Sequence, residues 1–375
     1  MAARAALGRA RRIVVKVGTR VLVDAAGRPD DDRIAELVGE LADLADQGRE
    51  VILVSSGAIA AGMEALGRSE RPEAISALQM CAAVGQTALL RRYARLFGLR
   101  RRIIGQVLLT HDGLSFRDRH LRARETLLAL IGSGVIPIVN ENDAVSVEEI
   151  AFGDNDQLAA LVALLIDADA LVLLTSVNGL QRRTEAGGLE RIPELAAVTD
   201  KELALAWGRG SALSSGGMAS KLRAASSAAR GGTLVLIADG SRPGTLARGC
   251  AGEDVGTLIG EGREGAALTP RKRWIGYFHK VEGRLTVDAG AREALISGGR
   301  SLLPVGITGV DGEFAIGALV ELLGPDGTAF ARGLVRHSAA RIAEIRGLRS
   351  EDWPGGLGSE ESPEVIHRDN LILTS

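Results

Sequence analysis

Two lysines and two polar clusters carry the residue types in this chain that could perform chemistry. Lys16 lies inside an apolar segment, and Lys221 begins a predicted helix after a stretch rich in glycine and serine. The clusters are Asn140-Glu141-Asn142-Asp143 and Gly153-Asp154-Asn155-Asp156. None of these groups contains a histidine, and no Cys-His pair or Ser-His-Asp order is visible, which argues against acyl-enzyme chemistry. Lysines with carboxylates and amides instead fit phosphoryl transfer, in which the protein mainly positions groups and neutralises charge.

The cluster at 153–156 precedes the apolar run 157–166, which is a helix candidate. Asp and Asn are favoured at a helix N-terminus because their side-chain oxygens accept hydrogen bonds from unpaired backbone N–H groups. Three such residues behind a glycine are more than a cap needs. A solvated cap and a functional cluster are equally good interpretations of this stretch taken alone.

The segment 13–19 predicts a buried strand that carries Lys16 toward its end. A lysine inside an apolar strand is costly unless it has an anionic partner. The alternative is an edge strand whose lysine extends into water. Because this segment is apolar on both faces, we predict a central strand and an anionic partner for Lys16.

The segment 50–62 reads as a strand, a small polar turn that contains Ser56, and a helix. Such a turn presents backbone N–H groups and a hydroxyl where anions bind, although a well-capped helix is the alternative. It is not a Walker A loop, because the Gly-Lys-Ser/Thr ending is missing. The stretch 210–221 is a second glycine-rich entry to a helix, for which a mobile linker is the alternative.

Strands and helices alternate to about residue 260, which predicts an α/β fold: an αβα three-layer sandwich with a mainly parallel sheet. The strand 135–139 ends at the cluster 140–143, and ligands of such sheets gather beyond the carboxyl ends of the strands. A solvated turn is the alternative there. From residue 271, short strands and turns predict a small β-barrel. We expect a first domain, a linker, a β domain and a C-terminal tail at 1–262, 263–270, 271–350 and 351–375.

Composition limits the class of protein. The chain has 375 residues and a formal net charge of −2, so no global attraction to nucleic acid or anionic membranes is expected. Its two cysteines, Cys81 and Cys250, are expected to be small buried side chains, and they fit a reducing, cytoplasmic location. The longest apolar region is interrupted by aspartates, so no transmembrane span is predicted. The basic residues 1–12 are predicted to form a frayed tail.

Five motifs in this order are similar to the glutamate 5-kinase family, a branch of the amino-acid-kinase fold. They are Val15-Lys16-Val17-Gly18-Thr19, Ser55-Ser56-Gly57-Ala58-Ile59-Ala60-Ala61-Gly62, Asn140-Glu141-Asn142-Asp143-Ala144, Gly153-Asp154-Asn155-Asp156 and Ser215-Gly216-Gly217-Met218-Ala219-Ser220-Lys221. The part that begins at Arg271-Lys272-Arg273-Trp274-Ile275 resembles a PUA domain. Together the resemblance covers nearly the whole chain.

The resemblance implies ATP-dependent phosphorylation of the side-chain carboxylate of L-glutamate to glutamyl 5-phosphate, the first step of proline synthesis. It implies that Lys16 and Lys221 stabilise charge during transfer and that Asp156 holds them in orientation. It implies glutamate contacts from Ser56, Asp143 and Asn155, with Asn140 as a neighbour. The implied ATP contacts are Lys16, Thr175, Ser176, Ser215, Gly216, Gly217, Met218, Ala219, Ser220 and Lys221. Mg²⁺ is expected on the phosphates, and no side chain is assigned as a metal ligand.

The resemblance also implies a homo-oligomer, feedback inhibition by proline, and hand-over of the unstable product to a reductase. One departure concerns Thr175-Ser176, where related sequences usually have Thr-Asp, and this weakens the assignment of Ser176. Another kinase of the same fold is the first alternative, since a shared fold does not fix the substrate. The second is RNA binding, because residues 271–273 with Arg336, His337, Arg341 and Arg346 could form a basic face; a solvated face or an oligomer contact is the simpler interpretation.

Overall fold

The computed structural model describes residues 2–145, 155–184, 188–207, 217–262, 281–354 and 362–374. The chain forms two compact units, Met1–Ala267 and Leu268–Ser375. The predicted linker 263–270 lies outside the described residues.

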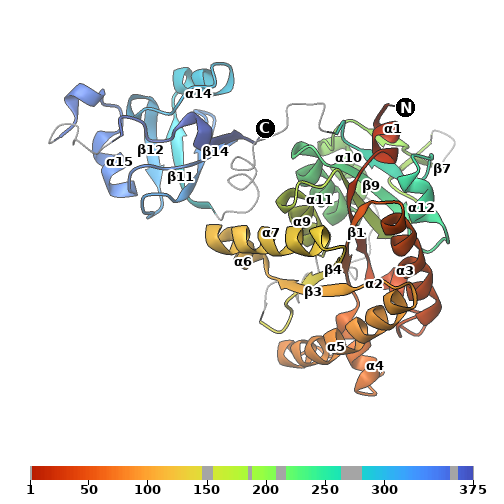
Figure 1. Cartoon of the computed structure of the whole chain (residues 1–375). Helices are drawn as coiled ribbons and strands as arrows, with labels where there is room; N and C mark the ends of the chain where they lie inside the picture. The colour runs from red at the N-terminus through yellow and green to blue at the C-terminus, as the bar shows by residue number, and fades with distance from the viewer. Residues whose placement is uncertain are drawn as a thin grey trace. The chain divides into compact units, whose positions relative to one another are not determined.

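Unit 1 is built on an eight-stranded sheet (Figure 1). In spatial order its strands are β3 (Ile104–Leu109), β4 (Ile136–Glu141), β2 (Glu50–Ser55), β1 (Arg12–Val17), β5 (Ala170–Thr175), β9 (Leu234–Asp239), β10 (Thr257–Ile259) and β8 (Glu194–Leu195). All neighbouring pairs are parallel except β9 with β10, which is antiparallel. The mainly parallel sheet predicted from the sequence is therefore confirmed. Two further strands, β6 (Gln181–Arg183) and β7 (Leu189–Arg191), pair antiparallel in a separate two-stranded sheet.

Helices cover both faces of this sheet, so the αβα sandwich is confirmed (Figure 1). One face is covered by α7 (Arg117–Gly132), α9 (Asn155–Leu165) and α11 (Met218–Arg230), and α10 (Asp200–Trp207) packs against α11. The opposite face carries α3 (Asp31–Asp46), α5 (Ile75–Leu99) and α12 (Thr245–Cys250), with α4 (Ala58–Ala65) packed on α5 and α1 (Ala2–Gly8) on α12. Two short helices, α2 (Thr19–Leu22) and α6 (His111–Ser115), follow β1 and β3.

The central position of β1 explains how Lys16 is directed. β1 lies between β2 and β5, so it is not an edge strand, as predicted. Ile13, Val15 and Val17 belong to the core cluster that also contains residues of α3 and α5. Because side chains alternate along a strand, Lys16 faces the opposite side of the sheet, where α9 and α11 pack.

The N-terminal segment corrects one expectation. The frayed tail predicted for residues 1–12 is wrong, because Ala2–Gly8 form α1 and Arg4 is buried. The Arg4 guanidinium donates to the carbonyl oxygens of Glu253 and Val255 at 2.6 and 3.0 Å and to that of Pro193 at 2.9 Å. These hydrogen bonds from the buried guanidinium to backbone carbonyls hold α1 in place. An arginine-rich composition does not reveal such partners, which is why a frayed tail was expected.

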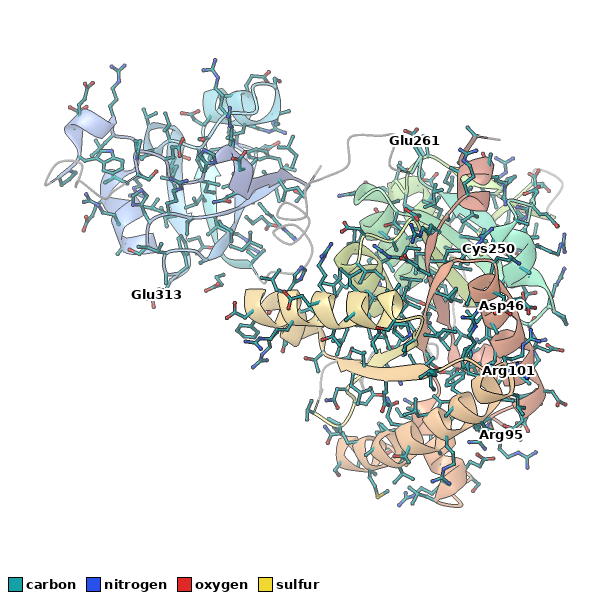
Figure 2. The ribbon with its side chains drawn as sticks, viewed as in Figure 1. Asp46, Arg95, Arg101, Cys250, Glu261 and Glu313 are labelled. Atoms are coloured by element: carbon teal, nitrogen blue, oxygen red, sulfur yellow. The ribbon has the colours of Figure 1, made fainter. Side chains whose placement is uncertain are left out.

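Both cysteines are buried and free, as predicted. Burial raises the pKa of the Cys250 thiol to about 12, and its side chain lies inside unit 1 at the end of α12 (Figure 2). Other ion pairs of this unit reach its surface, for example the one between Arg102 and Asp46 of α3, which Figure 2 labels. No helix in the described part of the chain is long and apolar enough to span a membrane.

Unit 2 contains a five-stranded mixed sheet in the order β12 (Ile307–Asp311), β11 (Val281–Val287), β13 (Leu319–Leu323), β14 (Ala329–Leu334) and β15 (Leu371–Leu373). Beside it are α14 (Ala289–Ile296), α15 (Ala339–Ile345) and the 3₁₀ turns Pro304–Gly306, Ser350–Asp352 and Arg368–Asn370. The small β domain predicted here is present, as a mixed sheet.

The prediction that 351–375 is a separate tail is wrong for its described residues. β15 pairs antiparallel with β14, and Trp353, Val365 and Ile366 are buried. Val365 and Ile366 belong to the core cluster of unit 2. The prediction rested on the Gly- and Pro-rich composition of the segment, and it overlooked the few apolar residues that complete this core.

Candidate active site

The carboxylate of Asp156 links two lysines that are far apart in the sequence. Lys16 Nζ lies 2.7 Å from Asp156 Oδ1, and Lys221 Nζ lies 2.9 Å from Asp156 Oδ2. Lys16 comes from β1, Asp156 from the first turn of α9, and Lys221 from the first turn of α11. The anionic partner predicted for Lys16 is thus present, and the same carboxylate serves both cations.

All three side chains are almost completely shielded from water, with exposed fractions of 6% for Lys16, 7% for Lys221 and 1% for Asp156. Burial alone would raise the pKa of Asp156, but attraction to Lys16 and Lys221 outweighs it and holds the pKa below its usual value. The carboxylate is therefore ionised at neutral pH. The three side chains together carry a formal charge of +1, which favours an anion nearby.

Asn155 connects the ends of two strands to α9. Its Nδ2 donates to the carbonyl oxygen of Ser55 at 3.1 Å, to Ser56 Oγ at 3.0 Å and to Asn140 Oδ1 at 3.0 Å. Ser56 follows β2, and Asn140 lies near the end of β4. The structure therefore brings Ser56 and Asn140 to Asn155, the residue that directly precedes Asp156 in the sequence.

The turn after β2 has a backbone that only glycine adopts easily. Gly57 has φ +98° and ψ 5°, in the left-handed region, and it is the N-cap residue of α4. It reverses the chain directly after Ser56, while the Ser56 N–H donates to the Val17 carbonyl at 3.3 Å. The Gly57 conformation thus fixes where the Ser56 hydroxyl lies.

A further acid in this region, Asp143, lies half-buried in the turn that follows β4. Glu141, which ends β4, is buried with 6% of its surface exposed. In the sequence, Glu141 is marked only by its place in the polar cluster 140–143. Gly153 and Asp154 of the second cluster lie outside the described residues.

The predicted nucleotide contacts lie at the ends of β5 and α11. Thr175 is the last residue of β5 and is half-buried, and Ser176 after it is exposed. Gly217 is the N-cap residue of α11, and Met218, Ala219, Ser220 and Lys221 form its first turn. The helix N-terminus therefore presents its positive end beside Lys221, an arrangement that favours anions. Ser215 and Gly216 lie outside the described residues.

Sequence reasoning missed Asp239, which pairs with Thr175 in the register of β5 and β9. It is 8% exposed and accepts hydrogen bonds from Ser241 while its other oxygen lies 3.1 Å from Arg242 Nε. A polar residue directly after the apolar strand 234–238 was the available signal.

Two of the arginines proposed for an RNA-binding face pair with carboxylates in unit 2. Arg336 lies 3.6 Å from a carboxylate oxygen of Glu364, and Arg341 lies 3.1 Å from one of Glu344. His337 is 4% exposed, and its Nε2 is 2.8 Å from the carbonyl oxygen of Ser362. These pairings weaken the interpretation of a basic face. Residues 271–273 lie outside the described part of the chain.

Two family models match this chain. The model described as the amino acid kinase family matches residues 11–239, and the PUA domain model matches residues 283–355. The first covers the strands and helices that carry Lys16, Ser56, Asn155, Asp156 and Lys221.

Curated relatives match over almost the full length. The chain is 44% identical to glutamate 5-kinase of Trichlorobacter lovleyi over 372 residues, which is 99% of this chain and 98% of the relative. It is 45% identical to glutamate 5-kinase of Myxococcus xanthus over 373 residues, with the same coverage. It is 46% identical to glutamate 5-kinase of Thioalkalivibrio sulfidiphilus over 372 residues, 98% of each chain.

Proposed function

The chain belongs to the amino acid kinase family, in its glutamate 5-kinase branch, and from this premise we propose how its residues carry out the reaction. The activity is glutamate 5-kinase, the first step of proline biosynthesis. A side-chain carboxylate oxygen of glutamate forms a bond to the γ-phosphorus of ATP, and the bond from that phosphorus to the bridging oxygen of ADP breaks. No proton needs to move, because a glutamate side chain with a pKa of about 4.3 is already ionised at neutral pH.

Lys16 and Lys221 overcome the repulsion between the incoming carboxylate and the phosphates. Their ammonium groups share one carboxylate, at 2.7 and 2.9 Å, so the three side chains together carry a formal charge of +1. Asp156 fixes the position of both groups before the substrates bind, and this preorganisation is the main source of electrostatic catalysis. The buried Lys16–Asp156–Lys221 cluster is the single observation that carries the proposal.

Ser56 and Asn155 are assigned to glutamate. Ser56 Oγ accepts a hydrogen bond from Asn155 Nδ2, so its own hydroxyl hydrogen is oriented away from Asn155 and is suited to donate to a carboxylate. Asn140 holds Asn155 through its side-chain oxygen at 3.0 Å. Asp143, half-buried at the same edge of the sheet, is assigned to the ammonium group of glutamate.

The nucleotide is assigned to Thr175, Ser176 and the entry to α11. The backbone N–H groups at the N-terminus of α11 suit phosphate oxygens, and Lys221 follows within the first turn. Mg²⁺ bound to the phosphates would neutralise part of their charge. Both oxygens of Asp156 already pair with ammonium groups, so we assign the magnesium contacts to phosphate oxygens.

An ATP-dependent hydroxamate assay tests the substrate. The acyl phosphate formed from glutamate should be trapped by hydroxylamine in the presence of ATP and Mg²⁺, while aspartate should give at most a few per cent of that rate. Turnover with aspartate but none with glutamate would contradict the proposal. Omitting Mg²⁺ should abolish the signal with glutamate.

Three further properties remain predictions from the family resemblance: a homo-oligomer, inhibition by proline, and hand-over of product to a reductase. The chemistry supports hand-over, because a mixed anhydride hydrolyses and cyclises readily in water. A cytoplasmic location also stays a prediction. RNA binding is the less favoured role of unit 2; it would require salt-dependent RNA affinity that is lost on deleting residues 271–375.

A further inference from the structure

A buried tyrosine reaches the glutamate-binding turn from the far side of the sheet. Tyr93 lies in α5, is 0% exposed, and belongs to the core cluster on the face opposite α9. Its hydroxyl oxygen lies 2.9 Å from Ser55 Oγ, which is also fully buried at the end of β2. None of the roles assigned above uses Tyr93 or the Ser55 side chain.

The direction of this hydrogen bond follows from the other contact of Ser55. Ser55 Oγ donates its one hydrogen to the carbonyl oxygen of Ser56 at 3.0 Å. A hydroxyl has a single hydrogen, so Tyr93 must be the donor to Ser55. Burial raises the pKa of Tyr93 to about 12, which keeps the phenol protonated and able to donate at neutral pH.

Ser55 therefore joins Tyr93 to the residues assigned to glutamate. Its hydroxyl holds the Ser56 carbonyl, and its own carbonyl accepts from Asn155 Nδ2 at 3.1 Å. Gln86, two helical turns before Tyr93 on α5, makes a similar contact with the next strand: its Nε2 donates to the carbonyl oxygen of Glu141 at 3.3 Å. Helix α5 thus supports the ends of both strands that carry Ser56 and Asn140.

We propose that Tyr93 is a positioning residue for glutamate: its hydroxyl, through Ser55, fixes the orientation of Ser56 and of the Asn155 amide. This inference rests on the proposed function, because it concerns the same site. The alternative is that the hydrogen bond of the Tyr93 hydroxyl only stabilises the core. Its loss would then lower stability without affecting glutamate more than ATP. The KM values for glutamate and for ATP therefore distinguish the positioning role from the purely structural one.

The test is steady-state kinetics of the full-length Tyr93→Phe variant in the hydroxamate assay. Loss of one buried hydrogen bond should raise the KM for glutamate roughly tenfold, while kcat and the KM for ATP stay within about twofold. Ser55→Ala tests the same contact from the strand and should give a similar increase. The double variant should be little worse than either single variant, because both remove one shared contact.

Phe97→Leu is the matched control, because Phe97 is a buried residue of the same helix, with its ring centroid 6.5 Å from that of Tyr93. It should lower the melting temperature and leave the KM for glutamate unchanged. The proposal would be overturned if the KM for glutamate were unchanged in both Tyr93→Phe and Ser55→Ala. It would also be overturned if the KM for ATP rose as much as the KM for glutamate. Failure of the parent enzyme to phosphorylate glutamate would instead refute the proposed function, so the two failures are distinguishable.

Discussion

Lys221 donates to Asp156 across 2.9 Å, although 65 residues separate them in the chain. Both side chains are more than nine-tenths buried. A buried ion pair contributes little net stability, because desolvation offsets the attraction. In the proposed function, this carboxylate holds a cation in a water-poor site, where the charge would act strongly on a phosphoryl group.

Replacement of Lys221 should therefore reduce turnover more than binding. In Lys221→Ala we expect kcat to fall at least about 100-fold, the size of effect seen when one transition-state charge contact is removed, while the KM for glutamate changes less than about threefold. Lys201→Ala, at an exposed lysine of α10, is the control and should behave like the parent enzyme. Normal turnover in Lys221→Ala would refute the assigned role.

Asn155→Ala should have the opposite kinetic signature. The substitution removes the two amide hydrogens that serve three acceptors, the Ser55 carbonyl, Ser56 Oγ and Asn140 Oδ1. We expect the KM for glutamate to rise between about 10- and 100-fold, since each net hydrogen bond contributes about 1 kcal/mol, and the KM for ATP to stay within about twofold. Isothermal titration with glutamate in the absence of ATP would check the binding part directly. Equal weakening of ATP and glutamate would contradict the assignment.

Gly57→Ala should displace the Ser56 turn. With φ at +98°, an added Cβ costs about 1–2 kcal/mol, and relaxation of that strain would move the neighbouring hydroxyl. We expect a lower melting temperature together with a raised KM for glutamate. Gly27→Ala is the matched control, because Gly27 also has positive φ, +77°, and a Cβ added there would meet no atom of the described residues within 4 Å. It should lose similar stability with unchanged kinetics.

The stability of the enzyme should depend on Asp156 in acid. Its folded-state pKa is below the usual 3.8, so its contribution is fully present above pH 3.8 and is lost as the pH falls through the folded-state value. Asp156→Asn removes the carboxylate that both buried lysines share and should lower the free energy of unfolding by about 3 kcal/mol at pH 7. Urea unfolding of both proteins should show a constant difference from pH 5 to 8 and a smaller one below pH 3.8. A difference that grows in acid would contradict this sign.

Tyr93 should make folding stability fall at alkaline pH, the opposite direction to the acid-dependent loss expected from Asp156. Its pKa is raised from 10.0 to about 12 in the folded protein, so stability falls as the pH rises above 10. Tyr93→Phe has no such group, and its stability should decline less steeply between pH 10 and 12. The same unfolding series, extended to alkaline pH, measures the slope for both proteins; equal slopes would contradict the assigned shift.

The sequence by itself determined the layered α/β architecture, the central position of β1 and the need of Lys16 for an anion. These features depend on local patterns: the apolar run around Lys16, the alternation of strands with helices, and the polar residues that directly follow apolar strands. The family motifs added candidate residues, and Ser56, Asn140 and Asn155 are in contact in the structure. Their substrate roles stay predictions.

Only the tertiary structure decided which side chains meet. Asp156 is shared by two lysines, rather than capping its own helix, because the strand order places β1 beside β5 and brings α9 and α11 over the same face. Tyr93 carries no motif signal, since its contact with Ser55 depends on how α5 packs on the sheet. Arg4 and β15 were missed for the same reason: their partners lie roughly 190 to 250 and about 40 residues away. Local periodicity fixes which face a residue occupies, and only long-range packing fixes its partner.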